Sequence, residues 1–245
     1  MSLVLTSARY DLLETVRIPI ALVGSAFFPA ASMLFFVVPF AGDEPAGATF
    51  ATASMLVFSV MVSNLFRYGI GVSEERAQPW EPYTRTLPAG PLPRFAGRLL
   101  SGLVIMLISL VPVVLIAALL TEATITPARF ALASGAVFVT ALPFALMGFA
   151  VGYALPSKAA LVVCQLIFFP LAFGGGLMSA PGQAPGFVES LAPFLPTRGA
   201  AELMWASVGD YPPHPVALGM LAVWTVALGA LAVWAYRRDE GRRFS

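Results

Sequence analysis

Six long apolar stretches divide this 245-residue chain. A helix needs about 20 predominantly apolar residues to cross the hydrocarbon core of a bilayer, and each stretch reaches that length. Hydrophobic residues make up 58% of the chain and charged residues only 11%, whereas soluble domains are about a quarter charged. The sequence therefore predicts an integral membrane protein with six transmembrane spans, at about residues 18–40, 50–70, 99–120, 130–155, 159–180 and 215–236.

Helices fit these stretches and strands do not. Backbone hydrogen bonds in lipid must be made internally, so helices and closed barrels are the two spanning structures. A barrel strand alternates polar and apolar side chains, and the run LVIMLISLVPVVLIAALL at residues 103–120 shows no such alternation. We therefore expect an all-α fold in one transmembrane domain over residues 1–245.

The distribution of basic residues predicts the orientation, because Lys and Arg collect in cytoplasmic loops. With the N-terminus inside, only Arg129 and Arg198 fall on the outer side. Both termini are thus expected in the cytoplasm, and the preponderance of Arg over Lys, beside abundant Ala, Gly and Pro, indicates the inner membrane of a bacterium with a GC-rich genome. The basic residues on the inner side are Arg9, Arg17, Arg67, Arg76, Arg85, Arg94, Arg98, Lys158, Arg237, Arg238, Arg242 and Arg243.

Two segments, residues 1–17 before the first span and residues 179–214 between the fifth and sixth spans, are not expected to cross the membrane. Residues 1–17 combine an apolar face with spread charges, which predicts an amphipathic helix at the membrane interface rather than a signal peptide; a frayed tail of the first span is the alternative. Residues 179–214 are too apolar for a free loop and too rich in Pro for one straight helix. We expect them to form short helices folded back against the outer face, after a hinge at Gly174, Gly175 and Gly176.

Several kinds of chemistry lack the residues they need. The only lysine, Lys158, follows no glycine-rich loop, so the chain carries no phosphate-binding loop of the Walker type and is not its own ATPase. One cysteine and one histidine form no disulfide and no metal cluster. Cys164 is expected to serve packing, and His214 to lie in a loop. No catalytic residue, cofactor site or metal site is predicted on this chain.

Polar groups at membrane depth are also scarce. No carboxylate falls within the six predicted spans, which disfavours ion-coupled transport because such transporters keep an ionisable group there. Asn64, in the inner half of the second predicted span, is an uncharged polar residue at membrane depth. A buried amide of this kind usually hydrogen-bonds a neighbouring helix, and lining a transport pathway is the alternative role.

The segment GVSEERAQPWEPYTRTLPAGPLPRFAGRLLSGL at residues 71–103 resembles the cytoplasmic segment of type-2 permeases of ATP-binding-cassette exporters. In that family an acidic and basic start leads to a short helix, a Leu-Pro pair and a basic, aromatic entry into the third span. The segment GGGLMSAPGQAPGFVESLAPFLPTRGAAELMW is similar to the family's broken outer hairpin, whose second short helix carries an acidic residue, here Glu202. The order of these motifs covers almost the whole chain.

The resemblance implies a permease that pairs with a separate ATPase subunit and with a second permease copy or paralogue. ATP and Mg would lie on the ATPase, and no nucleic acid is expected as a partner. Residues 71–98 would form the cytoplasmic coupling loop. Gln78 near the cap and Pro79 at the first position would begin a short, stiff helix that ends before Pro88. The residues expected to contact the ATPase are Glu74, Glu75, Arg76, Trp80, Glu81, Arg85 and Leu87.

The apolar spans favour a hydrophobic or amphipathic substrate, such as a drug, antibiotic or lipid-like molecule moved outward, because a strongly hydrated solute would pass them at a high desolvation cost. Two other functions stay open from the sequence. One is an ion-coupled secondary transporter, and the other is a membrane scaffold that transports nothing. The alternative for the coupling residues is a solvated loop with Trp80 anchored at the lipid headgroups.

Overall fold

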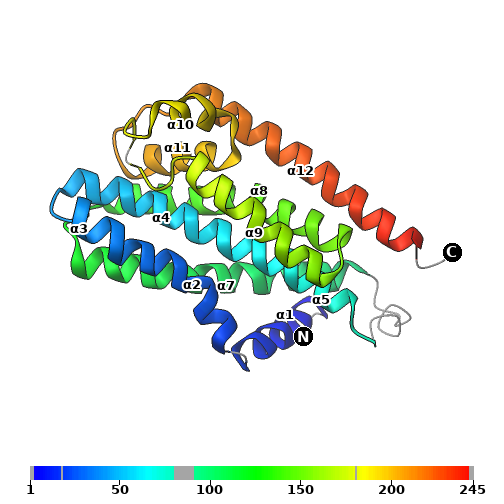
Figure 1. The fold of residues 1–245 in the computed structure, drawn as a ribbon. Coiled ribbons are helices and arrows are strands. Elements are labelled where there is room, and N and C mark those ends of the chain that lie inside the picture. The colour runs from blue at the N-terminus through cyan, green and yellow to red at the C-terminus, as the bar shows by residue number, and fades with distance from the viewer. Residues whose placement is uncertain (1–2, 18, 80–90, 180, 243–245) are drawn as a thin grey trace.

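The computed structural model describes residues 3–17, 19–79, 91–179 and 181–242. Every regular element in these ranges is a helix, which confirms the all-α prediction for the described part of the chain. Figure 1 shows long helices side by side in an elongated bundle, with α1 and the C-terminus at one end and the short helices α10 and α11 at the other. We call these the α1 end and the hairpin end.

The central element is a continuous helix that crosses the whole bundle. It consists of α4 (Pro45–Phe66), the π-helix η2 (Arg67–Gly71) and α5 (Val72–Arg76). Most residues of α4 after Ala51 are buried, and the helix packs against α7 (Pro91–Leu120), α8 (Pro127–Ala154) and α9 (Ser157–Gly174). The apolar side chains of the buried core therefore gather around α4.

Within the described ranges, five helices are long and apolar enough to cross a membrane. Four lie in α4–η2–α5, α7, α8 and α9, and the fifth is α12 (Pro215–Arg242). They correspond to the second through sixth predicted spans. The first predicted span corresponds to α2 (Pro19–Ser32), the π-helix η1 (Met33–Val37) and α3 (Val38–Ala41), which follow one another without a break. Within this region the stretch Ala26–Ala41 counts as a shorter apolar helix.

The helices extend beyond several predicted ends, which corrects one expectation. Glu74 and Glu75 lie in the last turns of the helix Pro45–Arg76, and Asp239 lies near the end of Pro215–Glu240. The predicted apolar stretches contain no carboxylate, but the full helices do. The helices continue because no Pro interrupts them at the apolar limit, and Gly69 and Gly71 keep a helical backbone there, so the charged ends project past the apolar belt.

Helix α1 (Leu3–Arg17) precedes α2, runs in a different direction from it and lies across the α1 end of the bundle (Figure 1). It packs against α7, with Ala8 buried and Leu5, Leu13 and Val16 exposed. A Cβ on Gly97 of α7 would lie 2.7 Å from the Cβ of Ser7, so the two helices approach closely there. The segment is amphipathic, as the sequence predicts, with one face on the protein.

Between α9 and α12 the chain forms three short elements. They are α10 (Gly186–Leu191), the 3-10 turn η3 (Ala192–Phe194) and α11 (Pro196–Val208). The sequence predicts two short helices in this region, at about the positions of α10 and α11. Helix α11 differs from a surface helix because it is buried almost throughout and packs against α4, α8 and α12. It is part of the core at the hairpin end.

Helix α8 approaches the end of α4 and η2 so closely that only glycine fits at two positions. A Cβ on Gly148 would lie 2.9 Å from the carbonyl oxygen of Asn64, and one on Gly152 would lie 2.4 Å from that of Tyr68. Small residues allow such backbone contact between membrane helices. The ring of Tyr68 then stacks on Phe149 of α8, with 4.3 Å between centroids. This contact positions η2 and α5 for the site described next.

Candidate functional site

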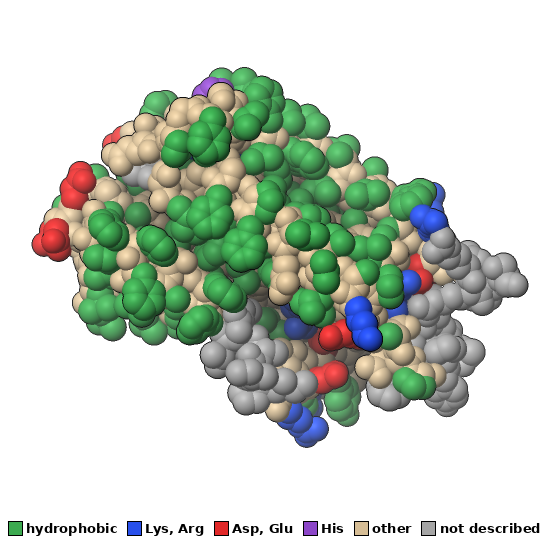
Figure 2. Space-filling model, in the orientation of Figure 1, with side chains coloured by type: hydrophobic (Ala, Val, Ile, Leu, Met, Phe, Trp, Pro, Cys, Tyr) green, Lys and Arg blue, Asp and Glu red, His purple; other side chains and the backbone are tan. Residues whose placement is uncertain are grey.

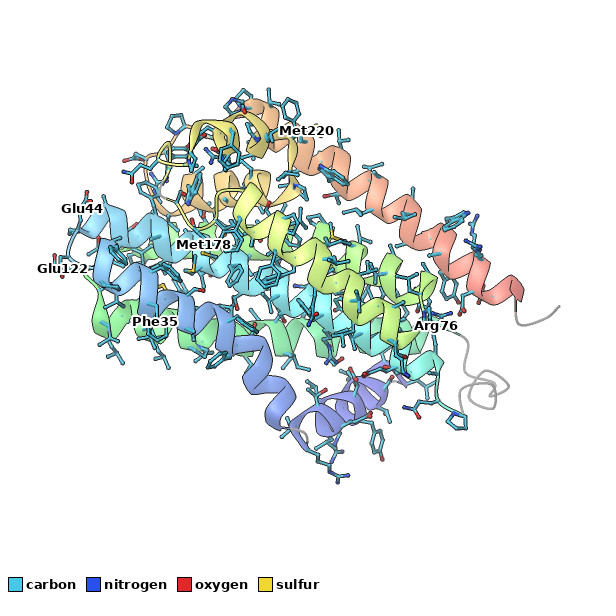
Figure 3. All side chains as sticks on the ribbon, in the orientation of Figure 1. Phe35, Glu44, Arg76, Glu122, Met178 and Met220 are labelled. Atoms are coloured by element: carbon cyan, nitrogen blue, oxygen red, sulfur yellow. The ribbon has the colours of Figure 1, made fainter. Side chains whose placement is uncertain are left out.

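Charge separates along the long axis of the bundle. At the α1 end lie the arginines of α1 and α5 and those near the end of α12, and Figure 2 shows the blue side chains gathered on that side. At the opposite end the exposed charged side chains are mainly acidic, and Figure 3 shows Glu44 and Glu122 there, far from Arg76. Of the described arginines only Arg129 and Arg198 lie at the hairpin end, held by α8 and α11.

Arg76 joins three helices at the α1 end. Its Nη1 donates to the carbonyl oxygens of Gly152 at 2.7 Å and Leu155 at 3.2 Å, which belong to the end of α8. Its Nη2 makes an ion pair with Asp239 of α12, whose side chain is only 4% exposed. A guanidinium group on the last carbonyls of a helix satisfies groups that have no partner within the helix. Arg76 therefore fastens the end of α5 to α8 and α12.

A second ion pair closes the base of the expected coupling loop. Glu75 at the end of α5 pairs with Arg98 near the start of α7, on the other side of residues 77–90. The Arg98 guanidinium also lies 3.5 Å from the hydroxyl of Tyr153. In addition, Ser157 at the start of α9 donates to the carbonyl of Ser73 at 3.1 Å. The two ends of the loop are thus tied together and to α8 and α9.

A third ion pair links α1 to the same region. Arg67 in η2 donates through Nη2 to Asp11 of α1 at 2.5 Å and to the hydroxyl of Ser101 at 3.1 Å. Ser101 of α7 in turn donates to Asp11. The extra residue per turn of a π-helix redirects side chains and is frequent at functional sites. Here it turns Arg67 toward α1 while Tyr68 faces α8.

We call the residues of these three ion pairs the coupling cluster; they are Asp11, Arg67, Glu75, Arg76, Arg98 and Asp239. Sequence reasoning selected Glu75 and Arg76 as docking residues and did not find the pairing. Arg67 and Asp239 were missed as site residues, although Arg67 stands directly after a long apolar run. The partners lie up to 163 positions apart along the chain, so only the folded bundle brings them together.

The predicted docking residues are only partly described. Glu74 is exposed, whereas Glu75 and Arg76 are engaged in the coupling cluster. Gln78 and Pro79 lie in a turn after α5. The short helix expected to follow falls outside the described residues, as do Trp80, Glu81, Arg85 and Leu87.

The hairpin end holds a buried ion pair within α11. Arg198 donates through Nε to Glu202 at 2.8 Å, and these residues are 5% and 0% exposed. Glu202 also accepts hydrogen bonds from the hydroxyl of Tyr211 at 3.3 Å and the backbone N–H of His214 at 3.0 Å. Burial and the neighbouring Glu202 carboxylate raise the pKa of Tyr211. We call Arg198, Glu202 and Tyr211 the hairpin cluster.

The hairpin cluster shows how Arg198, which the sequence places on the outer side, is accommodated within the protein. Arg198 lies in the first turn of a buried helix, 3.4 Å from a carboxylate oxygen of Glu189 and with its guanidinium 4.9 Å above the ring of Trp205. The tryptophan donates in turn to the hydroxyl of Ser54 in α4 at 2.9 Å. The cation is thus neutralised and packed inside the protein.

The glycine run after α9 is close-packed. Gly176 has φ of +73°, which L side chains rarely adopt. A Cβ on Gly175 would lie 2.0 Å from the hydroxyl oxygen of Thr197, and that hydroxyl donates to the carbonyl of Leu171 at 2.8 Å. The run therefore seats the start of α11 against the end of α9. The expected role of Gly174, Gly175 and Gly176 as a hinge stays a prediction.

Of the remaining polar candidates, Asn64 and Cys164 are buried and His214 is exposed. Asn64 is 3% exposed and donates to the carbonyl of Val60 at 2.8 Å, within its own helix rather than to a neighbour as expected. Cys164 is fully buried and its sulfur lies 3.7 Å from the carbonyl oxygen of Leu65. His214 lies between α11 and α12, as the sequence predicts for a loop residue. Cys164 packs against α4 in the core.

A helical bundle with exposed apolar sides, charged ends and several membrane-length helices defines a multi-pass membrane protein. Residues 2–207 match the family model described as "ABC-2 type transporter", so the chain belongs to that family. It is similar to a protein of Bacillus subtilis (strain 168) named as a transport permease, YvfS. The two are 25% identical over 166 residues, which cover 68% of each chain. The family resemblance seen in the sequence is thereby confirmed.

Proposed function

We propose that this chain is the membrane-spanning subunit of an exporter that moves a hydrophobic or amphipathic small molecule outward with the energy of a separate ATPase. The observation that carries the proposal is the membership of an ABC-2 transporter family over most of the chain. The name of the Bacillus relative, a transport permease, agrees with this role. A second permease copy or paralogue completes the assembly.

In this proposal the chain crosses the inner membrane six times. The uninterrupted helical stretch α2–η1–α3 serves as the first span, beside the five long apolar helices. The α1 end faces the cytoplasm because most basic residues lie there and cytoplasmic segments collect Lys and Arg. Helix α1 then lies at the inner interface with its exposed leucines toward lipid, and α10 and α11 lie on the outer side.

The coupling cluster supplies a route for force. The ATPase would press on residues 77–90, between α5 and α7. Arg76 connects that segment to α8 and α12, and Glu75 connects it to Arg98 of α7. A push on a segment held at both ends shifts the helices to which it is tied, as in other rigid-body switches. Glu74, exposed beside this segment, is free to face the ATPase.

The surface of the spans supports an apolar substrate. Exposed side chains along α2, α7, α9 and α12 are mostly Phe, Leu and Val, and the ion pairs described above lie at the two ends. A charged, hydrated solute would meet no compensating group over most of this length, which makes its transfer costly. A molecule already soluble in the bilayer would need no such group.

The coupling role is tested with the double variant Trp80→Ala, Arg85→Glu, reconstituted with the partner ATPase in lipid vesicles. We expect the variant to insert normally and to lose permease-stimulated ATP hydrolysis about tenfold or more, since removing an aromatic anchor from an interface costs at least about 2 kcal/mol. The matched control is Glu44→Gln, Glu122→Gln, which alters two exposed charges at the opposite end. It should keep full stimulation.

Unchanged stimulation in the Trp80 and Arg85 variant would overturn the docking assignment. Transport by the chain alone along an imposed ion gradient would instead favour a secondary transporter. Stable membrane insertion with no ATPase partner and no transport would favour a scaffold.

A further inference from the structure

An open groove of about 590 Å³ lies along the last turns of α12, outside the coupling and hairpin clusters. Small and apolar residues line one end of it, and two arginines lie at its other end. The groove thus combines an apolar floor with a cationic rim. Its described lining consists of Gly229, Ala230, Val233, Trp234, Arg237 and Arg238.

The two arginines differ from those of the coupling cluster. Arg67 and Arg76 are ion-paired to carboxylates of neighbouring helices. Within the described ranges no carboxylate lies at ion-pair distance from Arg237 or Arg238, and both are exposed. The nearby Asp239 is occupied by Arg76, and Glu240 accepts from the hydroxyl of Tyr236 at 2.6 Å. Among the described residues, no acid therefore neutralises these two positive charges at the groove.

The order of residues along the groove matches the layers of a membrane. From Gly229 to Arg238 the helix rises about 13 Å, at about 1.5 Å per residue. Val233 lies within the apolar stretch, and Trp234 stands one turn before the arginines, where tryptophan anchors at the interface between lipid and water. The guanidinium of Arg238 lies 5.1 Å above the Trp234 ring. That ring orients the cation at the depth of lipid headgroups.

We propose that this groove binds an anionic phospholipid, with the phosphate on Arg237 and Arg238 and an acyl chain along Gly229, Ala230 and Val233. Charge complementarity selects an anionic ligand, and the apolar floor selects one with a hydrocarbon chain. A soluble phosphate would use only the rim, and an acidic protein surface would not reach the floor. Basic pockets beside membrane helices bind anionic headgroups in this way.

The proposal is tested on the full chain, purified in detergent and mixed with equal amounts of phosphatidylglycerol and phosphatidylcholine of the same acyl chains. Native mass spectrometry measures which lipid stays bound. We expect the wild type to retain phosphatidylglycerol preferentially. The variant Arg237→Gln, Arg238→Gln should lose about 30-fold of that preference, since each basic residue near an anionic headgroup contributes about 1 kcal/mol.

The matched control is Arg9→Gln, Arg17→Gln, which removes two exposed charges from α1 at the same end and should leave the preference unchanged. A second variant, Ala230→Phe, fills the floor and keeps both arginines. It should reduce retention of phosphatidylglycerol, and monodisperse elution shows that each variant is folded.

Three results would overturn the proposal. Equal retention of the two lipids by the wild type would remove the anionic selectivity. An equal loss in the Arg9 and Arg17 control would show a general effect of charge. Full retention by Ala230→Phe, or displacement of the lipid by glycerol phosphate, would show that only the rim binds, as for a free anion or an acidic partner surface.

Discussion

At the scale of single residues, burial decides which ion pairs matter. Arg198 and Glu202 are almost fully enclosed, and removing Glu202 would leave the buried Arg198 with only its longer contact to Glu189, at 3.4 Å. The pair between Arg129 and Asp210 is different because Asp210 is 99% exposed and its charge is screened by water. Arg129 contributes mainly through its hydrogen bonds to the carbonyls of Ala206 and Gly209, which cap the end of α11.

The variant Glu202→Ala is expected to lower the free energy of unfolding by about 3–5 kcal/mol, because it leaves Arg198 buried and removes the acceptor for Tyr211 and His214. Thermal unfolding in detergent, followed by circular dichroism, measures the change. Glu122→Ala removes an exposed carboxylate at the hairpin end and should unfold like the wild type. If the two variants unfold alike, the hairpin cluster does not stabilise α11.

At the scale of elements, the contact between α8 and η2 controls the geometry of the coupling cluster. Gly152 contributes its carbonyl to Arg76 and its missing side chain to the approach of Tyr68. The π-helix places Arg67 and Tyr68 on different partners. In the proposed mechanism, a rigid contact at this point would let the end of α5 move α8 and α12 as one unit.

Gly152→Leu is expected to prevent this approach, because even its Cβ would meet the backbone of η2, and overpacking at so close a contact costs about 1–3 kcal/mol or more. Folded yield after detergent extraction and, in the fraction that folds, stimulation of the ATPase measure the loss. Gly135 of the same helix faces open space, so Gly135→Leu is the matched control and should retain both. Equal loss in the two variants would show that α8 is merely sensitive to any substitution.

At the scale of the whole molecule, the separation of charge between the two ends has a direct consequence for orientation. The α1 end carries basic residues on α1, α5, α7, α9 and α12, and the hairpin end carries exposed acids at the turns after α3 and α7. Those two turns meet, since the N–H of Glu122 donates to the carbonyl of Gly42 at 2.8 Å. The acidic turns thus form one face, and we expect it to be extracytoplasmic.

Single cysteines at the two ends measure this orientation in intact cells. Cys164 is the chain's one cysteine and is buried, so it is expected to be protected from modification. Glu122→Cys should react with a membrane-impermeant maleimide added outside, and Arg9→Cys only after the membrane is opened. The reverse pattern would contradict the proposed topology and place the coupling cluster outside, away from any ATP.

Much of the architecture is predictable because it depends on local properties. The length of each apolar run is sufficient to predict the helices, and the order of short motifs predicted the family. Glycine and proline indicated the break after α9. The ends of the helices were less predictable, since α4 continues through η2 to Arg76 where the apolar pattern stops near Ile70.

The sequence by itself determined a helical membrane protein with most of its positive charge on one side, because lipid demands long apolar helices and cytoplasmic loops collect basic residues. Only the tertiary structure decided which charges are neutralised. Arg76 and Asp239 pair although they are remote in sequence. Helix α11 can lie in the core because its charged residues Arg198 and Glu202 form an ion pair with each other. Pairings of this kind depend on where whole helices pack, which no local pattern specifies.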